Sequence, residues 1–257
     1  MSTVLFDIGN TRLKWGVLTP SGAVAGAGYR THKECESDNY AAVLETLPAD
    51  VDRAMAANVA GRRVAADLAR AIDDKAGIDI DFVASTAGVC GLSNGYEEPA
   101  RLGVDRWMAC VGAWSRYPHE ALLVVDAGTA TTLDAVDSSG RHLGGLILPG
   151  LTLMGRVLDT STSGIGTDGA GADDPEPENL FGRSTDQAVR SGALAAICGA
   201  MERACRVLQG MDQLPRILLT GGDARRIQRQ WHYTVENRPD LVLEGLAALA
   251  TDGAGAE

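Results

Sequence analysis

Two stretches of the sequence decide the fold: Asp7-Ile8-Gly9-Asn10-Thr11 and, about 120 positions later, Asp126-Ala127-Gly128-Thr129-Ala130-Thr131. Each follows a short apolar run that ends in aspartate, and each continues through small and hydroxyl-bearing residues into a second apolar segment. This order predicts a strand, a tight turn and another strand in both places. Because the pattern occurs twice, we expect a duplication of about half the chain, with two similar lobes and a cleft between them.

The rest of the chain alternates between strand and helix patterns, which is typical of α/β folds. We expect strands at residues 4–6, 13–17, 23–29, 54–59, 78–83, 122–125, 132–136, 142–148, 216–220 and 232–235. Helical spacing of apolar residues predicts helices at 39–47, 62–75, 105–115, 151–158, 185–208, 224–230 and 241–250. Residues 86–103 are expected to form a loop, and 161–179 a mobile loop, because Gly, Ser and Pro are frequent in both. The lobes are expected at 1–118 and 119–250, followed by a frayed tail at 251–257.

The composition is that of a globular protein and excludes several kinds of partner. The chain has 257 residues, 45% of them hydrophobic and 22% charged, and its net charge is −11. An acidic protein gains nothing electrostatically from a nucleic-acid backbone, so we expect no nucleic-acid partner. No apolar run approaches the roughly 18 residues of a membrane span, and the N-terminus lacks a signal-peptide pattern. The five cysteines form no CxxC pair and the four histidines lack metal-ligand spacing, which indicates reduced thiols and a cytoplasmic location.

The first turn has the chemistry of a phosphate site. Gly9 lets a phosphate approach the backbone closely, and Asn10 and Thr11 add side-chain donors beside the N–H groups of the turn. Lys14 can neutralise a phosphate oxygen, and Asp7 at the strand end can hold Mg²⁺ directly or through water. Taken alone, these residues fit an ordinary β-hairpin equally well.

The second turn repeats this chemistry at Asp126, Gly128, Thr129 and Thr131. The pair of turns resembles the phosphate-1 and phosphate-2 motifs of the acetate-kinase/sugar-kinase/actin ATPase superfamily. That resemblance implies a duplicated ribonuclease-H-like α/β fold, with mixed central sheets flanked by helices and a nucleotide cleft between the lobes. Residues 221–223 (Gly-Gly-Asp) resemble its adenosine motif, although a helix cap or a plain turn also fits. A GxGxxG match at 164–169 has no strand before it and fails the context of a dinucleotide fold.

Gly103-Val104-Asp105-Arg106 opens a predicted helix after a glycine-rich loop. An aspartate there can accept the proton of a hydroxyl that attacks the γ-phosphate, and the arginine can bind a carboxylate or a phosphoryl group. An acid stabilised by the helix dipole fits the same position. The chain resembles type III pantothenate kinases over nearly its whole length, in the order of these features: the DIGNT turn, Tyr96, residues 103–106, DAGTATTLDAV at 126–136, GGLILPG at 144–150, and Thr185.

The resemblance implies ATP-dependent phosphorylation of pantothenate to 4'-phosphopantothenate, the first step of coenzyme A biosynthesis, with Asp105 as general base. It also implies that the reaction uses Mg²⁺ and that a monovalent cation, potassium or ammonium, binds near Asp126. It further implies a homodimer in which Thr185 reaches the partner's pocket. The expected ATP-binding residues are Asp7, Ile8, Gly9, Asn10, Thr11, Arg12, Leu13, Lys14 and Thr129. The expected pantothenate-binding residues are Tyr96, Gly103, Val104, Asp105, Arg106 and Thr185.

The chain departs from the family pattern between Leu158 and Thr185, where Thr160-Ser161-Thr162-Ser163 and a Gly/Asp/Pro-rich insertion replace a Leu-Pro element. This leaves open the wall of the substrate pocket and the role of Thr185. Two other functions fit the sequence: a kinase of the same superfamily for another small alcohol, and a non-catalytic nucleotide-binding accessory factor for transcription. Asp105 argues against the second, because binding alone needs no base.

Overall fold

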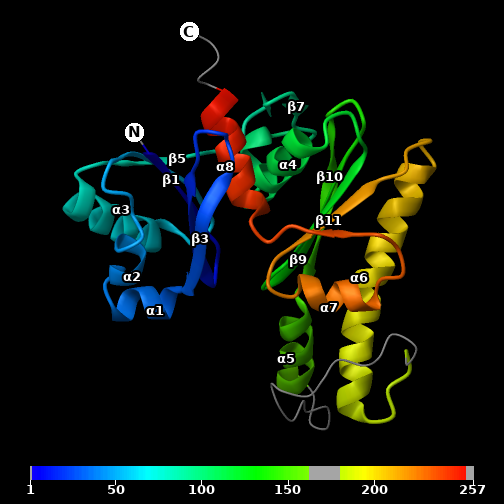
Figure 1. Ribbon diagram of the computed structural model, residues 1–257. Helices are drawn as coiled ribbons and strands as arrows, with labels where there is room; N and C mark the ends of the chain where they lie inside the picture. The colour runs from blue at the N-terminus through cyan, green and yellow to red at the C-terminus, as the bar shows by residue number, and fades with distance from the viewer. Residues whose placement is uncertain (1, 162–179, 253–257) are drawn as a thin grey trace. The chain divides into compact units, whose positions relative to one another are not determined.

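The computed structural model describes residues 2–161 and 180–252 (Figure 1). Their contacts divide the chain into two units, the first with residues up to 118, 140–142 and from 240 onward, the second with 119–139 and 143–239. Each unit contains one five-stranded sheet. The predicted loop at 161–179, except for its first residue, and the GxGxxG match at 164–169 lie outside the described residues.

The sheet of the first unit has the strand order β3-β2-β1-β4-β5. Its central strand, β1 (Ser2–Ile8), pairs antiparallel with β2 (Arg12–Leu18) and parallel with β4 (Val51–Asn58). β3 (Val24–Thr31) and β5 (Ile80–Phe82) form the edges. One face of this sheet packs against α3 (Arg62–Ala76), whose buried side chains Leu68 and Ile72 share a core with Phe6 and Ile8.

The opposite face of β1 and β4 contacts two other helices, α4 (Val104–Arg116) and α8 (Leu241–Asp252). These helices pack closely because each has a glycine that lies against the backbone of the other. A Cβ at Gly112 of α4 would collide with Leu241 O, and a Cβ at Gly245 of α8 would collide with Met108 O. Such contacts leave no room for any larger residue. The C-terminal helix therefore lies with the first unit, whereas the sequence prediction grouped it with residues 119–250 and ended it two residues earlier.

The sheet of the second unit has the order β10-β9-β8-β11-β12. β8 (Leu122–Ala127) pairs antiparallel with β9 (Ala130–Val136) and parallel with β11 (Arg216–Thr220). β10 (His142–Pro149) and β12 (Glu236–Asn237) complete the sheet. The long helix α6 (Thr185–Gln209) buries Leu194, Ile197 and Met201 in the core of this unit, which also includes residues of β8 and β11. α5 (Leu151–Ser161) and α7 (Ala224–Gln230) are the other helices of the unit.

The two sheets have corresponding strand orders, which confirms the predicted duplication. In each, a central strand ending in the aspartate turn is followed by an antiparallel neighbour and has a parallel strand on its other side. Among the helices that the structure describes, none has both the length and the apolar character to cross a membrane.

Some predicted element bounds are wrong. The helix expected at 39–47 is replaced by α1 (His32–Ser37) and the short α2 (Ala41–Leu44). α1 begins early because Thr31 and Glu34 form a reciprocal capping box, and Tyr40 interrupts the pattern with a φ of 61°. The expected loop at 86–103 contains the hairpin of β6 (Gly88–Val89) and β7 (Leu92–Ser93) and a 3-10 turn at Pro99–Arg101. The strand expected at 232–235 forms instead at 236–237, as β12.

Candidate active site

The first aspartate turn joins the end of the central strand β1 to the start of β2. The N–H of Gly9 donates to the carbonyl of Arg12 at 3.0 Å, which closes the hairpin and leaves Asn10, Thr11 and Arg12 exposed. Asp7 pairs across the strands with Lys14, so both side chains project from the same face of the sheet. Ile8 and Leu13 form the next pair and are buried in the core, where they anchor the turn. The polar residues predicted at 7–14 thus lie together around this turn.

His32 holds this turn from the start of α1. Its Nε2 lies 2.6 Å from the carbonyl oxygen of Gly9, and its backbone N–H donates to Thr11 O at 3.2 Å. Since a carbonyl oxygen only accepts, this contact makes Nε2–H the donor. The sequence analysis missed His32 because it is remote in the chain, and no local pattern marks it.

The second aspartate turn, between β8 and β9, is enclosed by glycines of the second unit. The N–H of Gly128 donates to Ala130 O at 3.0 Å, and the N–H of Gly150 donates to Thr129 O at 3.0 Å. A Cβ at Gly150 would collide with the carbonyls of Gly128 and Thr129. Thr131 has a fully buried hydroxyl with no hydrogen-bond partner among the described residues. The GGLILPG segment therefore ends against the predicted phosphate turn.

The predicted adenosine motif also reaches this turn. Gly221 has a φ of +89°, and a Cβ there would collide with Asp126 Oδ1 and Ala127 O. The N–H of Asp223 donates to Ala127 O at 2.9 Å, while its carboxylate accepts from Arg226 at 3.0 Å. Gly221 is thus required both for its backbone conformation and for its closeness to Asp126.

Except for Thr185, the predicted acceptor residues lie close together in the first unit. Arg106 is buried, its guanidinium donates to the hydroxyl of Tyr96 at 2.9 Å, and it lies 5.7 Å from the centre of the Tyr96 ring. Asp105 lies in the first turn of α4, and its Oδ1 accepts the backbone N–H of Arg106 at 2.7 Å. Gly103 is the N-cap, and a Cβ there would come within 2.8 Å of Asp105 Oδ1. The Asp105 carboxylate thus lies at the helix start beside Gly103 and accepts the backbone N–H of Arg106, and Tyr96 contacts the Arg106 side chain.

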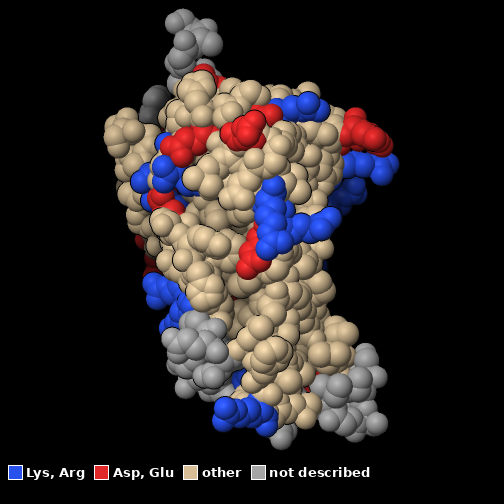
Figure 2. Space-filling model, turned by 90° about the vertical axis from the view of Figure 1, so that its right-hand side faces the viewer, with Lys and Arg blue, Asp and Glu red and all other residues tan. Residues whose placement is uncertain are grey.

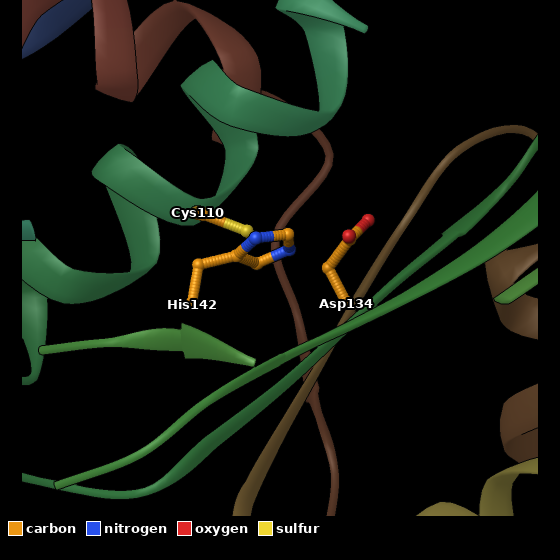
Figure 3. Close-up of side chains that lie close together, drawn as sticks. All are labelled: Cys110, Asp134 and His142. Carbon is orange, nitrogen blue, oxygen red and sulfur yellow. The ribbon is translucent and has the colours of Figure 1, made fainter. Parts of the chain in front are cut away.

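Asn94 and His142 complete this group, and the sequence analysis identified neither. The side chain of Asn94 accepts the N–H of Tyr96 at 3.0 Å and donates to the carbonyls of Thr86 and Pro99, which fixes the loop around Tyr96. His142 is fully buried, and Figure 3 shows its ring beside the Cys110 side chain of α4. Asp134, which is also labelled there, belongs to β9 of the second unit. Only the composition of the loop hinted at Asn94, and the histidines were expected to be structural or to lie on the surface because they lack metal-ligand spacing.

Thr185 lies in the second unit, as the exposed first residue of α6. Ser184 caps this helix by accepting the N–H of Gln187 at 3.2 Å. Thr185 borders an apolar groove of about 550 Å³ between α5 and α6, lined by Pro149, Met154, Val157, Leu158, Thr185, Ala188, Val189, Gly192 and Ala193. Its surroundings are apolar, unlike those of the other predicted substrate residues.

A second cavity of the same unit, about 320 Å³, contains none of the predicted site residues. It lies between the middle of α6 and residues 230–233, and Trp231 and Cys198 are among its lining residues. Burial raises the pKa of the Cys198 thiol to about 11, so this thiol is protonated at neutral pH and is a poor nucleophile.

Comparisons with known proteins identify the family of the chain. The family model described as type III pantothenate kinase matches residues 3–207. Curated type III pantothenate kinases from Azoarcus sp. and Nitrosococcus oceani are 40% and 35% identical to the chain. The first alignment covers 96% of this chain and 90% of the relative, and the second covers 97% and 94%.

Solved structures show the fold. A Baf family protein from Campylobacter jejuni has a TM-score of 0.57 at 19% identity, over 98% of this chain and 99% of that one. The ADPNP-bound activator of 2-hydroxyisocaproyl-CoA dehydratase from Clostridium difficile has a TM-score of 0.53 at 13% identity, over 99% and 96%. Each unit has the mixed sheet flanked by helices expected of the duplicated ribonuclease-H-like fold. With the match at 35–40% identity over nearly its full length, the chain belongs to the type III pantothenate kinase family.

Proposed function

We propose that this protein transfers the γ-phosphoryl group of ATP to the primary hydroxyl of pantothenate, which forms 4'-phosphopantothenate in the first step of coenzyme A biosynthesis. The family membership supports the reaction. The observation that carries the assignment to residues is the group formed by Asp105, Arg106 and Tyr96 at the start of α4.

Asp105 is proposed as the general base. The backbone N–H of Arg106 donates to Oδ1, which fixes the orientation of the carboxylate, and the N-terminus of α4 favours its ionised form. The side chain is partly exposed, so it is reachable by a hydroxyl group. The base takes the proton of the acceptor hydroxyl as that oxygen attacks the γ-phosphorus, and ADP leaves on the opposite side.

Arg106 is proposed to bind the carboxylate of pantothenate, with Tyr96 as a second polar contact. The guanidinium of Arg106 donates to the Tyr96 hydroxyl, so the two side chains form one polar group. Arginine recognises a carboxylate through two parallel hydrogen bonds. Gly103 and Val104 contribute by placing these side chains at the helix start.

The two aspartate turns are proposed to contact the ATP phosphates. Gly9, Asn10, Thr11 and Arg12 offer backbone and side-chain donors, and Thr129 is an exposed residue of the second turn. Thr131, whose buried hydroxyl has no hydrogen-bond partner among the described residues, follows at the start of β9. Phosphoryl transfer requires chiefly positioning and charge neutralisation, which such donors provide.

The carboxylates fit the metal ions that the reaction needs. Asp7 and Asp126 lie at the ends of the two central strands, and carboxylate oxygens are the ligands that Mg²⁺ prefers. When bound, Mg²⁺ neutralises charge on the phosphate oxygens. We assign a potassium or ammonium ion to Asp126, because its Oδ1 and the carbonyl oxygen of Ala127 both lie close to Gly221 and are oxygen donors.

A homodimer is the proposed assembly, formed through α5 and α6. The exposed face of α6 carries small residues, which allow a second helix to approach closely: Gly192, Ala195, Ala196 and Gly199. Val157 and Leu158 of α5 are 48% and 38% exposed beside the apolar groove. Figure 2, which looks at the side on which α6 lies in Figure 1, shows a broad surface with few charged side chains. Thr185, at the edge of the groove, then contributes to the partner's pantothenate site.

The cytoplasm is the proposed location. All five cysteines have free thiols, and burial raises the pKa of the Cys90 thiol to about 11. Reduced thiols of this kind are typical of the cytoplasm.

An assay that measures ADP release by the protein in the presence of ATP and Mg²⁺ tests the function. We expect turnover only when pantothenate is added, and more with potassium or ammonium than with sodium. Asp105→Asn should lower kcat by about 10²- to 10⁴-fold, the usual contribution of a general base, while the affinity for ATP stays nearly unchanged.

A panel of other small alcohols and a binding assay for ATP complete this experiment. Turnover with a different alcohol but not with pantothenate would transfer the assignment to another acceptor. ATP binding with no acceptor-dependent turnover would favour the non-catalytic accessory role. An equal loss of ATP binding in Asp105→Asn would make Asp105 structural or metal-linked.

A further inference from the structure

The segment Gly140–His142 belongs to the first unit although the residues on both sides of it belong to the second. Its backbone is joined to the substrate loop, because the N–H of Ser93 donates to Gly140 O at 2.9 Å and Ser93 forms a parallel bridge with Arg141. Gly140 has a φ of +85°, and a Cβ there would press on Gly91 O and on the Trp114 ring. The segment is therefore fixed against the loop that carries Tyr96.

His142 ends this segment with a side chain that is completely buried. Its ring centre lies 5.8 Å from that of Tyr96 at an interplanar angle of 31°, and 6.3 Å from that of Trp107 at 71°. A ring nitrogen of His142 also lies within 4.8 Å of the Cys110 Sγ (Figure 3). The two ring-centre distances, to Tyr96 and to Trp107, are within the range of favourable aromatic pairs. The imidazole thus fills the space between α4 and the ring of Tyr96.

The orientation of the Tyr96 side chain affects the direction of the Arg106 guanidinium, because the two side chains are in contact. The Tyr96 hydroxyl accepts from the Arg106 guanidinium, and the Tyr96 ring contacts both that guanidinium and His142. If the ring of Tyr96 turned away, the guanidinium of Arg106 would lose its hydrogen bond to the Tyr96 hydroxyl. A ring beside Tyr96 limits such movement, since well-packed interiors resist repacking.

We propose that His142 is a positioning residue for the acceptor site. Its ring holds Tyr96 in the orientation that directs Arg106 toward the carboxylate of the acceptor. This inference rests on the proposed function, because it takes Tyr96 and Arg106 as the residues that bind pantothenate. It assigns to His142 no contact with the substrate and no proton transfer.

The first test compares His142→Leu, which removes the ring, with His142→Phe, which keeps one. We expect the KM for pantothenate to rise about three- to tenfold in His142→Leu, the usual contribution of a ring pair, and to return toward wild type in His142→Phe. The KM for ATP should not change in either variant. A thermal unfolding curve for each variant separates this effect from loss of the fold.

A double-mutant cycle with Tyr96→Leu tests whether His142 acts through Tyr96. His142→Leu should have no further effect on the KM for pantothenate once the Tyr96 ring is gone. Additive effects of the two substitutions, or equal increases in both KM values, would overturn the inference.

A measurement on the wild-type protein covers the case in which the variants fail to fold. The protein contains four histidines, so ¹⁵N-histidine labelling gives few ring signals, and single glutamine substitutions at the other three identify that of His142. Pantothenate should shift the His142 signal in a saturable way, and its absence at saturating pantothenate would refute the inference. If wild-type protein shows no pantothenate-dependent turnover, the proposed function fails. If Tyr96→Phe raises the KM for pantothenate and His142→Leu does not, only the positioning role fails.

Discussion

Gly221→Ala is expected to damage the second aspartate turn beyond the general cost of adding a methyl group to a glycine. The φ of +89° costs an L-residue about 1–2 kcal/mol. The new Cβ would also overlap Asp126 Oδ1 and Ala127 O, and overpacking of this kind adds about 1–3 kcal/mol. We therefore expect a loss of about 2–5 kcal/mol in the free energy of unfolding, as the sum of the two effects.

Gly61→Ala is the matched control. Gly61 has a similar φ of +92°, but a Cβ there would meet nothing within 4 Å. Only the conformational cost of about 1–2 kcal/mol should appear, and urea unfolding curves of the two variants measure the difference. The affinity for ATP should fall in Gly221→Ala and stay constant in Gly61→Ala, because only Gly221 lies against a proposed phosphate turn. Equal losses of stability in the two variants would refute the reasoning from close contact.

Three further predictions concern the phosphate turn, the response to alkaline pH and the assembly. His32→Phe removes the hydrogen bond to Gly9 O and should raise the KM for ATP about three- to tenfold, with His232→Gln as an exposed control, since one hydrogen bond contributes about 1 kcal/mol. Burial raises the pKa of Tyr40 from 10.0 to about 12, so the folded state binds its proton more tightly than the unfolded state. The resulting stability is complete below pH 10 and is lost as pH rises toward 12, by up to about 3 kcal/mol, so Tyr40→Phe should flatten the alkaline fall in urea midpoints while the exposed Tyr29→Phe should not. Val157→Asp places a charge in the apolar groove and should convert a dimer into monomers in sedimentation equilibrium, whereas Leu214→Asp, which is exposed outside the groove, should leave the assembly intact.

Local patterns in the sequence were sufficient to predict the duplication. Each aspartate turn lies between two strands that are adjacent in the chain, so apolar runs and turn residues reveal both pairs without knowledge of distant contacts. The same reasoning located α3 and α6, whose apolar residues recur with helical spacing. The prediction was wrong around Tyr40, where the apolar spacing of 39–47 suggested one continuous helix. Tyr40 has a left-handed backbone conformation, which separates α1 from α2.

The site residues divide in the same way. Asp105, Arg106 and Gly103 follow one another at a helix start, so a short motif identifies them together. Tyr96 contacts Arg106 directly, and Asn94 and His142 in turn contact Tyr96. Such contacts follow no fixed spacing along the chain. An inventory of titratable residues therefore finds the histidines, and only the folded chain distinguishes His142 from the exposed ones.

Two glycines of the second unit show the same dependence on contacts between distant parts of the chain. Gly150 and Gly221 are remote from each other in the sequence, yet both leave room for the carbonyls of the second aspartate turn. From the local sequence alone, each of these glycines fits a helix start or a plain turn. Because a Cβ at either position would collide with backbone, the GGLILPG segment and the adenosine motif are shaped by the same requirement, which is close packing against Ala127–Thr129. A substitution that enlarges either residue should therefore act on this one turn.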